Sequence, residues 1–429
     1  MRAPDWHAAE LPSTIERFSN GLTVVVHVEG KSPVVAVYLG YSAGSRDEPA
    51  SKAGLAHLSE HLMFTGTKRN PGSYFASFEQ RGAAWMNAFV REDFSAYFAT
   101  VPAAELDFAL SMESDRMVNL ADAIDDERVD RQRKVVINEL RQREGQPYGC
   151  VPRILAALVH PPGHPYAHPP DGLESELNSI TTDDVRGWIE SRHLPHNAIL
   201  IVVGDVEPLY VLERADHYFG QLPTSGISGR SGFSIAHPTR IRRQIQLPVN
   251  QARLYIAWNG PPLGSADFPA LELACEILAG GKSSRLLRRA TQSERVATAA
   301  ALDLRPRQLT SLIVLTVAVR PEIPLSGVEA LVREEIEQLA RVLDPADLDI
   351  ARLRIFSRMV RGYERVGGPE SRSDALGQAA MLAGSPASHT ERLRLLASAP
   401  TSAVAGALAY LADHGVVLEI HPAGRRSDT

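Results

Sequence analysis

The stretch Gly54-Leu-Ala-His57-Leu-Ser-Glu60-His61-Leu-Met-Phe64 carries the most informative pattern in this chain. No proline or glycine interrupts residues 55–65, and most of them are good helix formers, which predicts a helix. Positions four apart share one helix face, so His57 and His61 point the same way. Two imidazoles at this spacing can hold one zinc ion, and Glu60 flanks the same face. A carboxylate placed there can act as a general base on water at the metal.

The order of these residues is His-x-x-Glu-His, the inverted form of the common zinc-hydrolase motif. The alternative is an amphipathic helix with two histidines on its polar side. Apolar neighbours such as Leu58, Leu62 and Phe64 favour burial, where polar groups without partners are costly. The pattern therefore favours a metal site.

Composition sets the outer limits of the interpretation. The chain has 429 residues, a net charge of −6, and 44% hydrophobic residues, which is enough for two or three globular domains. The negative charge gives no reason to expect a nucleic-acid or anionic-membrane partner. With only Cys150 and Cys275, no disulfide framework or cysteine metal site is expected. Without an apolar signal core or a run of eighteen apolar residues, we expect no membrane span and a cytoplasmic location.

The order of predicted elements indicates an internal duplication. Asn20-Gly21 predicts a hairpin turn, and further hairpin, strand and helix patterns continue to residue 219. Residues 223–232 are low in bulky side chains, and a flexible linker is predicted over 223–240. Strand, loop, helix and glycine then recur over 242–281, as in 33–66, which predicts a domain at 1–222 and a homologous one at 241–429. The second copy places Leu273 and Ile277 where the first has His57 and His61, so it is expected to lack a metal site.

A third ligand is needed, because a catalytic zinc ion typically takes three protein ligands and a water. Glu139 is the candidate, on a helix predicted over 126–143 that turns Val135 and Val136 inward. Taken alone, such a glutamate usually faces solvent. A second cluster, His160, His164 and His168, is interrupted by prolines that forbid a helix, so its spacing does not favour a metal site.

The chain resembles the inverted-zincin metallopeptidases of the pitrilysin/insulinase family, which include mitochondrial processing peptidases. The resemblance covers most of residues 14–220 and rests on ordered matches: Asn20-Gly21-Leu-x-Val, Gly44-Ser-Arg-Asp-Glu48, His57-Leu-x-Glu60-His61-Leu-x-Phe-x-Gly66-Thr67, Arg-x-Val-Val-x-x-Glu139, His164-Pro-Tyr and Val-Gly204-Asp205.

The resemblance implies a fold, a metal site and a mode of substrate binding. The fold is α+β, with two homologous α/β-sandwich units, each a largely antiparallel sheet of about six strands packed with helices. The zinc ligands are His57, His61 and Glu139, and Glu60 is the general base. Asn87, Ala88 and Phe89 resemble the edge strand that binds a peptide by main-chain hydrogen bonds.

Two departures from the family pattern bear on activity. A second glutamate often precedes the third ligand, but this chain has Gln132, which supplies no negative charge. Active members also carry an Arg/Tyr pair after a Gly-x-Ser-Ser-Arg-Leu stretch, and the Tyr can stabilise the oxyanion. Here the stretch Gly281–Leu286 is present, but Thr291 and Thr298 stand at the pair's positions.

The favoured interpretation is therefore a zinc endopeptidase subunit that forms a heterodimer with a similar chain. That partner would lack the zinc motif and supply the Arg/Tyr pair. One alternative is a homodimer that uses other donors, such as Arg285 or Tyr363. The other is a non-catalytic core or assembly subunit, as in respiratory complexes, which the complete His57, Glu60 and His61 set disfavours.

Overall fold

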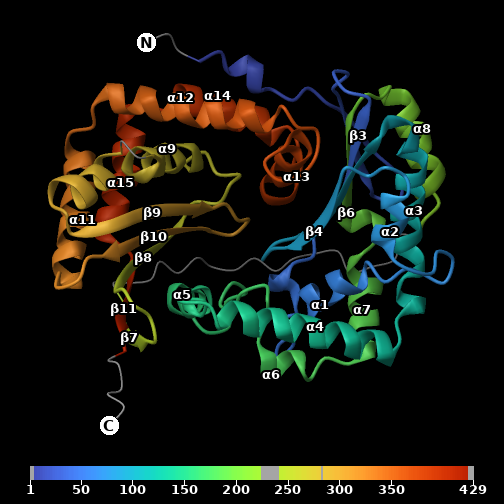
Figure 1. Cartoon of the computed structure of the whole chain (residues 1–429). Coiled ribbons are helices and arrows are strands. Elements are labelled where there is room, and N and C mark those ends of the chain that lie inside the picture. The colour runs from blue at the N-terminus through green and yellow to red at the C-terminus, as the bar shows by residue number, and fades with distance from the viewer. Residues whose placement is uncertain (1–3, 224–240, 282–283, 424–429) are drawn as a thin grey trace.

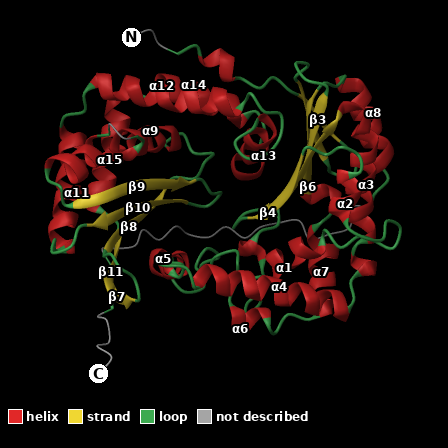
Figure 2. Ribbon diagram, viewed as in Figure 1, coloured by secondary structure: helices red, strands yellow, loops and turns green. Residues whose placement is uncertain are grey.

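The computed structural model of the chain describes residues 4–223, 241–281 and 284–423 (Figure 1). Apart from Pro223, the predicted linker at 223–240 lies outside the described residues. Two sheets, each packed with helices, make an α+β fold of two domains, which confirms the predicted fold class (Figure 2). The first sheet is built from residues before the linker range and the second from residues after it.

The first sheet has six strands and ends in the predicted peptide-binding strand. Its order is β1-β2-β6-β3-β5-β4, so β4 is an edge strand. The strands are β1 Thr14–Arg17, β2 Thr23–Val28, β3 Val34–Tyr41, β4 Trp85–Val90, β5 Ser95–Pro102 and β6 Ala198–Gly204.

The second sheet has five strands, one fewer than the expected six, in the order β7-β11-β8-β10-β9. Its strands are β7 Arg242–Leu247, β8 Arg253–Gly260, β9 Ala297–Arg305, β10 Ser311–Val319 and β11 Val416–Pro422. The pair β11–β7 is parallel and the other pairs are antiparallel, as in β2-β6-β3-β5-β4. The two sheets thus repeat one topology, as the predicted duplication requires.

The helices follow the same division. In the first half they are α1 Leu55–Leu62, α2 Tyr74–Glu79, α3 Leu106–Asn119, α4 Asp126–Glu144, α5 Val151–Val159, α6 Glu174–Leu177, α7 Thr182–Arg192 and α8 Pro208–Phe219. In the second half they are α9 Phe268–Ala279, α10 Arg285–Arg288, α11 Leu325–Arg341, α12 Pro345–Gly362, α13 Arg372–Ala383, α14 Ser388–Ser398 and α15 Thr401–Asp413.

One helix of each half packs on the sheet of the other half. Residues of α1, α3, α7 and α8 pack on one face of the first sheet, and α13 from the second half packs on the other. Residues of α9, α11 and α15 cover one face of the second sheet, and α5 from the first half packs on β8 and β11. A Cβ at Gly377 of α13 would lie 2.7 Å from the Tyr38 hydroxyl, so this glycine permits the close approach. The two cores are therefore completed only when both halves are folded.

The halves also meet through a buried polar cluster at the hairpin tips. Asp93, between β4 and β5, accepts hydrogen bonds from Arg46 (2.9 Å), from the Tyr166 hydroxyl (2.5 Å) and from the Gln308 backbone (2.9 Å). Gln308 lies between β9 and β10, and its side chain accepts a further bond from Arg46 at 2.8 Å. This cluster fixes the end of β4 against the second half.

Among the described residues, no single helix has the length and apolar composition to cross a membrane. Helices α14 and α15 pass such a test only as a pair, although they are bent by 97° at the break. Their apolar side chains, including Leu393, Leu396, Leu408 and Leu411, are buried in the core of the second half.

Candidate metal centre

Helix α1 carries the predicted motif and begins directly after Gly54. Gly54 has a φ of 98°, and a Cβ there would lie 2.6 Å from the Leu177 side chain, so glycine is required. Because glycine offers no capping side chain, buried Glu48 accepts hydrogen bonds from the N–H groups of Gly54 (3.1 Å) and Ala56 (2.8 Å). The loop before the helix thus supplies the acid that fixes its first turn.

Helix α4 packs against α1 and brings Glu139 to the motif. Val129, Val136 and Leu140 form its buried stripe. Val135, predicted to face inward, is 40% exposed, because the inward face recurs every three to four residues and Val136 occupies it. Glu139 precedes Leu140 at the margin of this stripe, so its carboxylate reaches α1 while the side chain stays 42% exposed.

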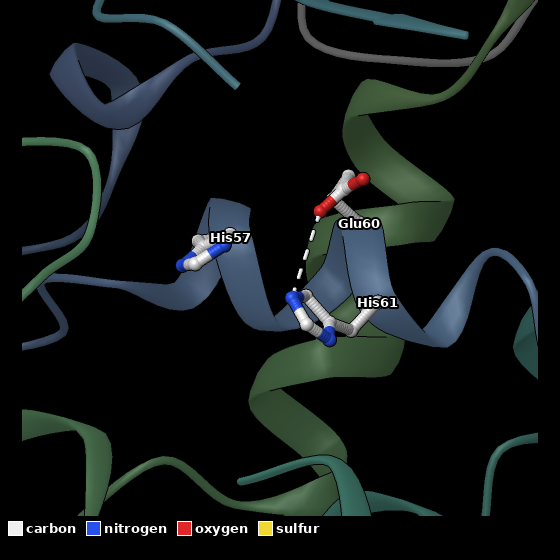
Figure 3. Close-up of side chains that lie close together, drawn as sticks. All are labelled: His57, Glu60 and His61. Carbon is white, nitrogen blue, oxygen red and sulfur yellow. Dashed lines mark ion pairs between the residues drawn. The ribbon is translucent and has the colours of Figure 1, made fainter. Parts of the chain in front are cut away.

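The three predicted ligands converge. One oxygen of Glu139 lies 3.5 Å from His61 Nε2 and 3.9 Å from His57 Nε2. Figure 3 shows His57 and His61 on successive turns of α1, with Glu60 beside them, and Glu60 Oε2 lies 3.9 Å from His61 Nε2. Among the described residues, His57, Glu60 and His61 also form a group whose ligand atoms all lie within 4.8 Å of one another.

This arrangement fits a zinc ion. In a tetrahedral site with metal–ligand bonds of about 2.0–2.2 Å, neighbouring ligand atoms are about 3.3–3.6 Å apart. The Glu139 contacts of 3.5 and 3.9 Å are close to that spacing. Glu139 approaches both imidazoles, so it suits the third position, which leaves Glu60 beside the fourth. Two histidines and one carboxylate with an open position are a typical donor set of catalytic zinc.

Burial tunes the ionisable groups of the site. The pKa of His57 is lowered to about 3, chiefly by burial and further by His61 and Arg143, so its imidazole is neutral and keeps a lone pair. The pKa of Glu60 is raised to about 7, first by burial and then by the negative charge of Glu139. A carboxyl group with that pKa can both accept and return a proton near neutral pH.

A buried arginine behind Glu60 was not predicted from the sequence. Arg116 on α3 is 1% exposed, forms an ion pair with Glu113, and lies 4.4 and 4.3 Å from the ring centroids of Tyr74 and Tyr97. Its positive charge lowers the pKa of Glu60 and so offsets part of the rise that burial causes. The sequence pattern does place a charged pair among the apolar positions of α3, which could have indicated a buried ion pair. A charged residue on a helix is, however, normally taken to face solvent.

The predicted substrate residues lie on edge strand β4, which packs on α1. Asn87 is exposed, and its side-chain oxygen accepts a hydrogen bond from the Ala88 N–H at 2.9 Å. Ala88 faces the helix-covered core. Phe89 packs inward, with ring centroids 5.5 Å from Phe94 and 6.1 Å from Phe98, so its side chain is not free for a substrate.

The other candidate groups are engaged elsewhere. Arg285 pairs with Glu335 at 2.9 Å, and Tyr363 is 6% exposed with its hydroxyl 3.4 Å from His389. Neither is placed as a free donor, which weighs against the homodimer that would use them.

The histidines around His164 do not form a metal cluster. The rings of His160 and His164 stack at 4.5 Å in an irregular segment, and His168 lies 3.8 Å from Glu48 instead. Within the described residues, no group of three potential ligands forms there.

Comparison with known proteins places the chain. Residues 23–160 match the family model described as insulinase (peptidase family M16), and residues 179–355 match the one described as the peptidase M16 inactive domain. The zinc protease PqqE of Helicobacter pylori is 27% identical over 368 residues, which cover 83% of this chain and 80% of that protein. The uncharacterized zinc protease YmxG of Bacillus subtilis is 24% identical over 63% of this chain and 66% of its own length.

A non-peptidase name also occurs among the relatives, since subunit 1 of the Bos taurus mitochondrial cytochrome b-c1 complex is 25% identical over 62% of this chain and 56% of its own. Solved structures agree in fold. A protease from Helicobacter pylori has a TM-score of 0.85 at 22% identity, covering 96% of this chain and all (100%) of that one. A peptidase M16 inactive domain from Pseudomonas fluorescens has a TM-score of 0.82 at 19% identity, covering 96% and 98%. The chain therefore belongs to the pitrilysin/insulinase-type peptidase family.

Proposed function

We propose that this chain is a zinc-dependent endopeptidase subunit with His57, His61 and Glu139 as metal ligands. The observation that carries the proposal is the approach of one Glu139 oxygen to both imidazoles, at 3.5 and 3.9 Å, although these residues are 78 or more positions apart. The names of the zinc protease relatives support the same chemistry. The substrates proposed are peptides or unfolded polypeptides.

A zinc ion held there supplies Lewis-acid chemistry, because it polarises a carbonyl and lowers the pKa of a water ligand to about 7. Glu60 takes the proton of the attacking water and then delivers it to the leaving amine nitrogen. Burial, the chief cause of the raised pKa of Glu60, makes its carboxylate a stronger proton acceptor than an exposed one. Glu139 and the neutral His57 would bind the metal, together with His61.

We further propose that the peptide adds to the outer edge of β4. Within the described residues, β4 pairs only with β5, so its other edge is open to a further strand. Main-chain hydrogen bonds from the edge would hold a peptide in extended form with little sequence preference. Since the Ala88 N–H bonds the Asn87 side chain, Asn87 must turn away before the peptide can use that donor.

The subunit is proposed to need a partner that supplies an Arg/Tyr pair. Thr298 accepts a hydrogen bond from Gln251 at 2.7 Å, and Thr291 donates one to the Leu287 carbonyl at 2.6 Å. Neither side chain can replace a guanidinium or a phenol at an oxyanion. Assay of the isolated chain on a quenched peptide tests this, and full activity without any second chain contradicts it.

The chemistry is tested separately with Glu60→Gln. In the complex with the partner subunit, we expect kcat to fall by about 10²- to 10⁴-fold while zinc stays bound, because the variant loses the proton carrier and keeps all three metal ligands. Glu276→Gln is the matched control, since Glu276 precedes Ile277 on α9 as Glu60 precedes His61 on α1. Activity in Glu60→Gln equal to that of the control would remove Glu60 as the base.

A non-catalytic assembly subunit is the second candidate, favoured by the similarity to a cytochrome b-c1 subunit and to an M16 inactive domain. Metal analysis separates the two. About one zinc per purified chain supports the peptidase. A chain that binds no zinc when the metal is supplied supports the assembly subunit.

A further inference from the structure

Trp85, the first residue of β4, differs from the other tryptophans of the chain. Its side chain is 48% exposed, whereas Trp188 and Trp258 are 5% and 1% exposed. Trp6 packs on Phe356 with ring centroids 5.5 Å apart. A half-exposed indole on an open strand edge is an aggregation hazard unless something covers it. In Figure 1, β4 lies at the margin of the first sheet that faces the middle of the molecule.

A cavity of about 440 Å³ lies beside this indole. Its walls include Val34, Thr100 and Trp85 of the first sheet and Val366 and Gly367 of the second half. The volume falls in the range of small-ligand pockets, about 300–1,000 Å³, and exceeds what one amino-acid side chain requires.

Two glycines let a loop of the second half approach the sheet and the indole closely. A Cβ at Gly367 would lie 2.3 Å from the Thr100 hydroxyl, so this backbone rests directly on the sheet. Gly368 has a φ of +89°, and a Cβ there would lie 3.4 Å from Trp85 Nε1. The loop therefore supports one edge of the indole with backbone alone and leaves the remaining ring surface accessible.

The rim of the cavity carries charges of both signs. Glu29 pairs with Arg372 at 2.5 Å and lies 4.0 Å from Lys31, so its charge is compensated. Glu364 and Arg365 add one charge of each sign. The one excess positive charge belongs to Lys31, whose side chain is 84% exposed and therefore screened by solvent, whereas an indole face offers apolar contact and ring stacking.

We infer that the exposed indole of Trp85, which separates this cavity from the open edge of β4, is a specificity subsite for an uncharged aromatic or large aliphatic side chain of the bound peptide. This inference rests on the proposed function, in which the peptide adds to β4. Trp85 and Asn87 are two residues apart and lie on one face, about 7 Å apart along the strand. A peptide residue opposite Trp85 places its side chain on that face, in contact with the indole.

The test uses Glu60→Gln protein with zinc bound and a set of extended peptides that differ at one position among Phe, Leu, Ser, Asp and Lys. At one position along the peptide we expect Phe and Leu to bind about tenfold more tightly than Ser, Asp or Lys. In the background of Trp85→Ala this preference falls to about twofold or less, and Trp85→Phe retains most of it. Trp6→Ala is the matched control and keeps the preference.

A measurement on the unsubstituted indole covers the case in which Trp85→Ala fails to fold. Oxidation of Trp85 by N-bromosuccinimide, followed by mass spectrometry, should be slowed by the Phe peptide and not by the Ser peptide. Peptides that bind with no apolar preference, or with one that survives Trp85→Ala, overturn the subsite. If no peptide binds at all, the proposed function itself fails.

Discussion

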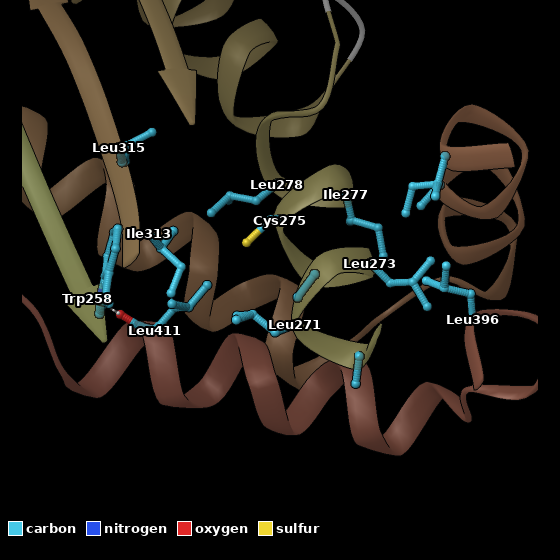
Figure 4. Packing of buried hydrophobic residues seen from close by; sticks show 14 of the residues in the cluster. Trp258, Leu271, Leu273, Cys275, Ile277, Leu278, Ile313, Leu315, Leu396 and Leu411 are labelled. Carbon is cyan, nitrogen blue, oxygen red and sulfur yellow. Dashed lines mark hydrogen bonds between the residues drawn. The ribbon is translucent and has the colours of Figure 1, made fainter. Parts of the chain in front are cut away.

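Helices α1 and α9 occupy corresponding places in the two halves, but α1 carries polar side chains at positions where α9 carries apolar ones. Each is followed by an edge strand of its sheet and packs against it, α1 against β4 and α9 against β9. Where α1 presents His57 and His61, α9 presents Leu273 and Ile277, which are 0% and 5% exposed. Figure 4 shows both side chains among other apolar groups, with Leu273 pointing toward Leu396.

The two helices also differ in what lies beside their glutamates. Glu276 precedes Ile277 as Glu60 precedes His61, and it pairs with Arg358 at 3.0 Å. Aligning the buried residues Leu348, Ile355 and Met359 of α12 with Val129, Val136 and Leu140 of α4 puts Arg358 at the place of Glu139. The second half thus carries its own cation, whereas the first half gathers two carboxylates and two imidazoles that need one from outside.

The largest effect is expected from the third ligand. Glu139→Ala should reduce bound zinc from about one per chain to a small fraction, since two histidines alone do not hold a catalytic zinc ion firmly. Metal analysis after dialysis against buffer measures this, and Arg358→Ala is the matched control in the second half. Unchanged zinc content in Glu139→Ala would mean that Glu60 or a water replaces the ligand.

Grafting the site onto α9 tests whether the fold of the second half can bind zinc once the three ligand residues are present. Leu273→His, Ile277→His and Arg358→Glu together should lower the free energy of unfolding by about 4 kcal/mol or more without metal, because polar groups replace apolar packing. Added zinc should recover about 4 kcal/mol at a thousandfold excess over its Kd. Urea unfolding with and without zinc measures both changes.

The control for the graft places asparagine instead of histidine at residues 273 and 277, which adds polarity without good zinc ligands. If zinc stabilises the histidine and asparagine versions equally, metal binding depends on more than the residues compared between α1 and α9.

The ion pair on α9 should contribute a moderate amount. Arg358→Met leaves Glu276 buried without its partner and should cost about 1–3 kcal/mol of unfolding free energy, less than for a fully buried pair because the arginine side chain is 47% exposed. Adding Glu276→Leu to this variant should restore most of the lost unfolding free energy. Arg361→Met on the same helix is the control, and an equal loss there would show that the effect is not specific to the pair.

A further comparison concerns the histidines that follow corresponding helices and depends on pH. His193 after α7 is buried, which lowers its pKa to about 3, with a further contribution from Arg116. Between about pH 6.5 and 3 the unfolded chain therefore binds a proton that the folded chain does not, and stability falls with decreasing pH by up to about 1.4 kcal/mol per unit.

His193→Phe should flatten this acid limb in urea unfolding measured at several pH values. His414, at the end of α15, bonds the Tyr410 carbonyl at 3.0 Å and is half-buried, so His414→Phe is the matched control. A His193→Phe curve that keeps the wild-type slope contradicts the assignment.

The sequence predicted the local features well. Spacing and caps identified α1, the hairpin β4–β5 and the repeated strand and helix order, because these depend on neighbouring residues. Family resemblance supplied Glu139, which spacing alone did not distinguish from a surface glutamate. The geometry then brought Glu139 to the two histidines as expected.

The features that were missed depend on contacts between distant segments. The charged pair on α3 does not by itself mark Arg116 as buried, since its environment is built from α2, β5 and Phe64, which follows α1. Likewise, the pattern of β4 did not show that Phe89 points inward. Phe94 and Phe98 of the same hairpin lie beside it, but this face of the hairpin is buried only by packing on the second half.

The exchange of α5 and α13 has a consequence for synthesis in the cell. The face of β3 and β6 stays uncovered until residues 372–383, which form α13, have left the ribosome. Before that point the nascent first half exposes apolar strand surface, which makes it prone to aggregation. For the same reason, a chain cut between the halves should yield fragments that are insoluble apart and recover their fold only when refolded together.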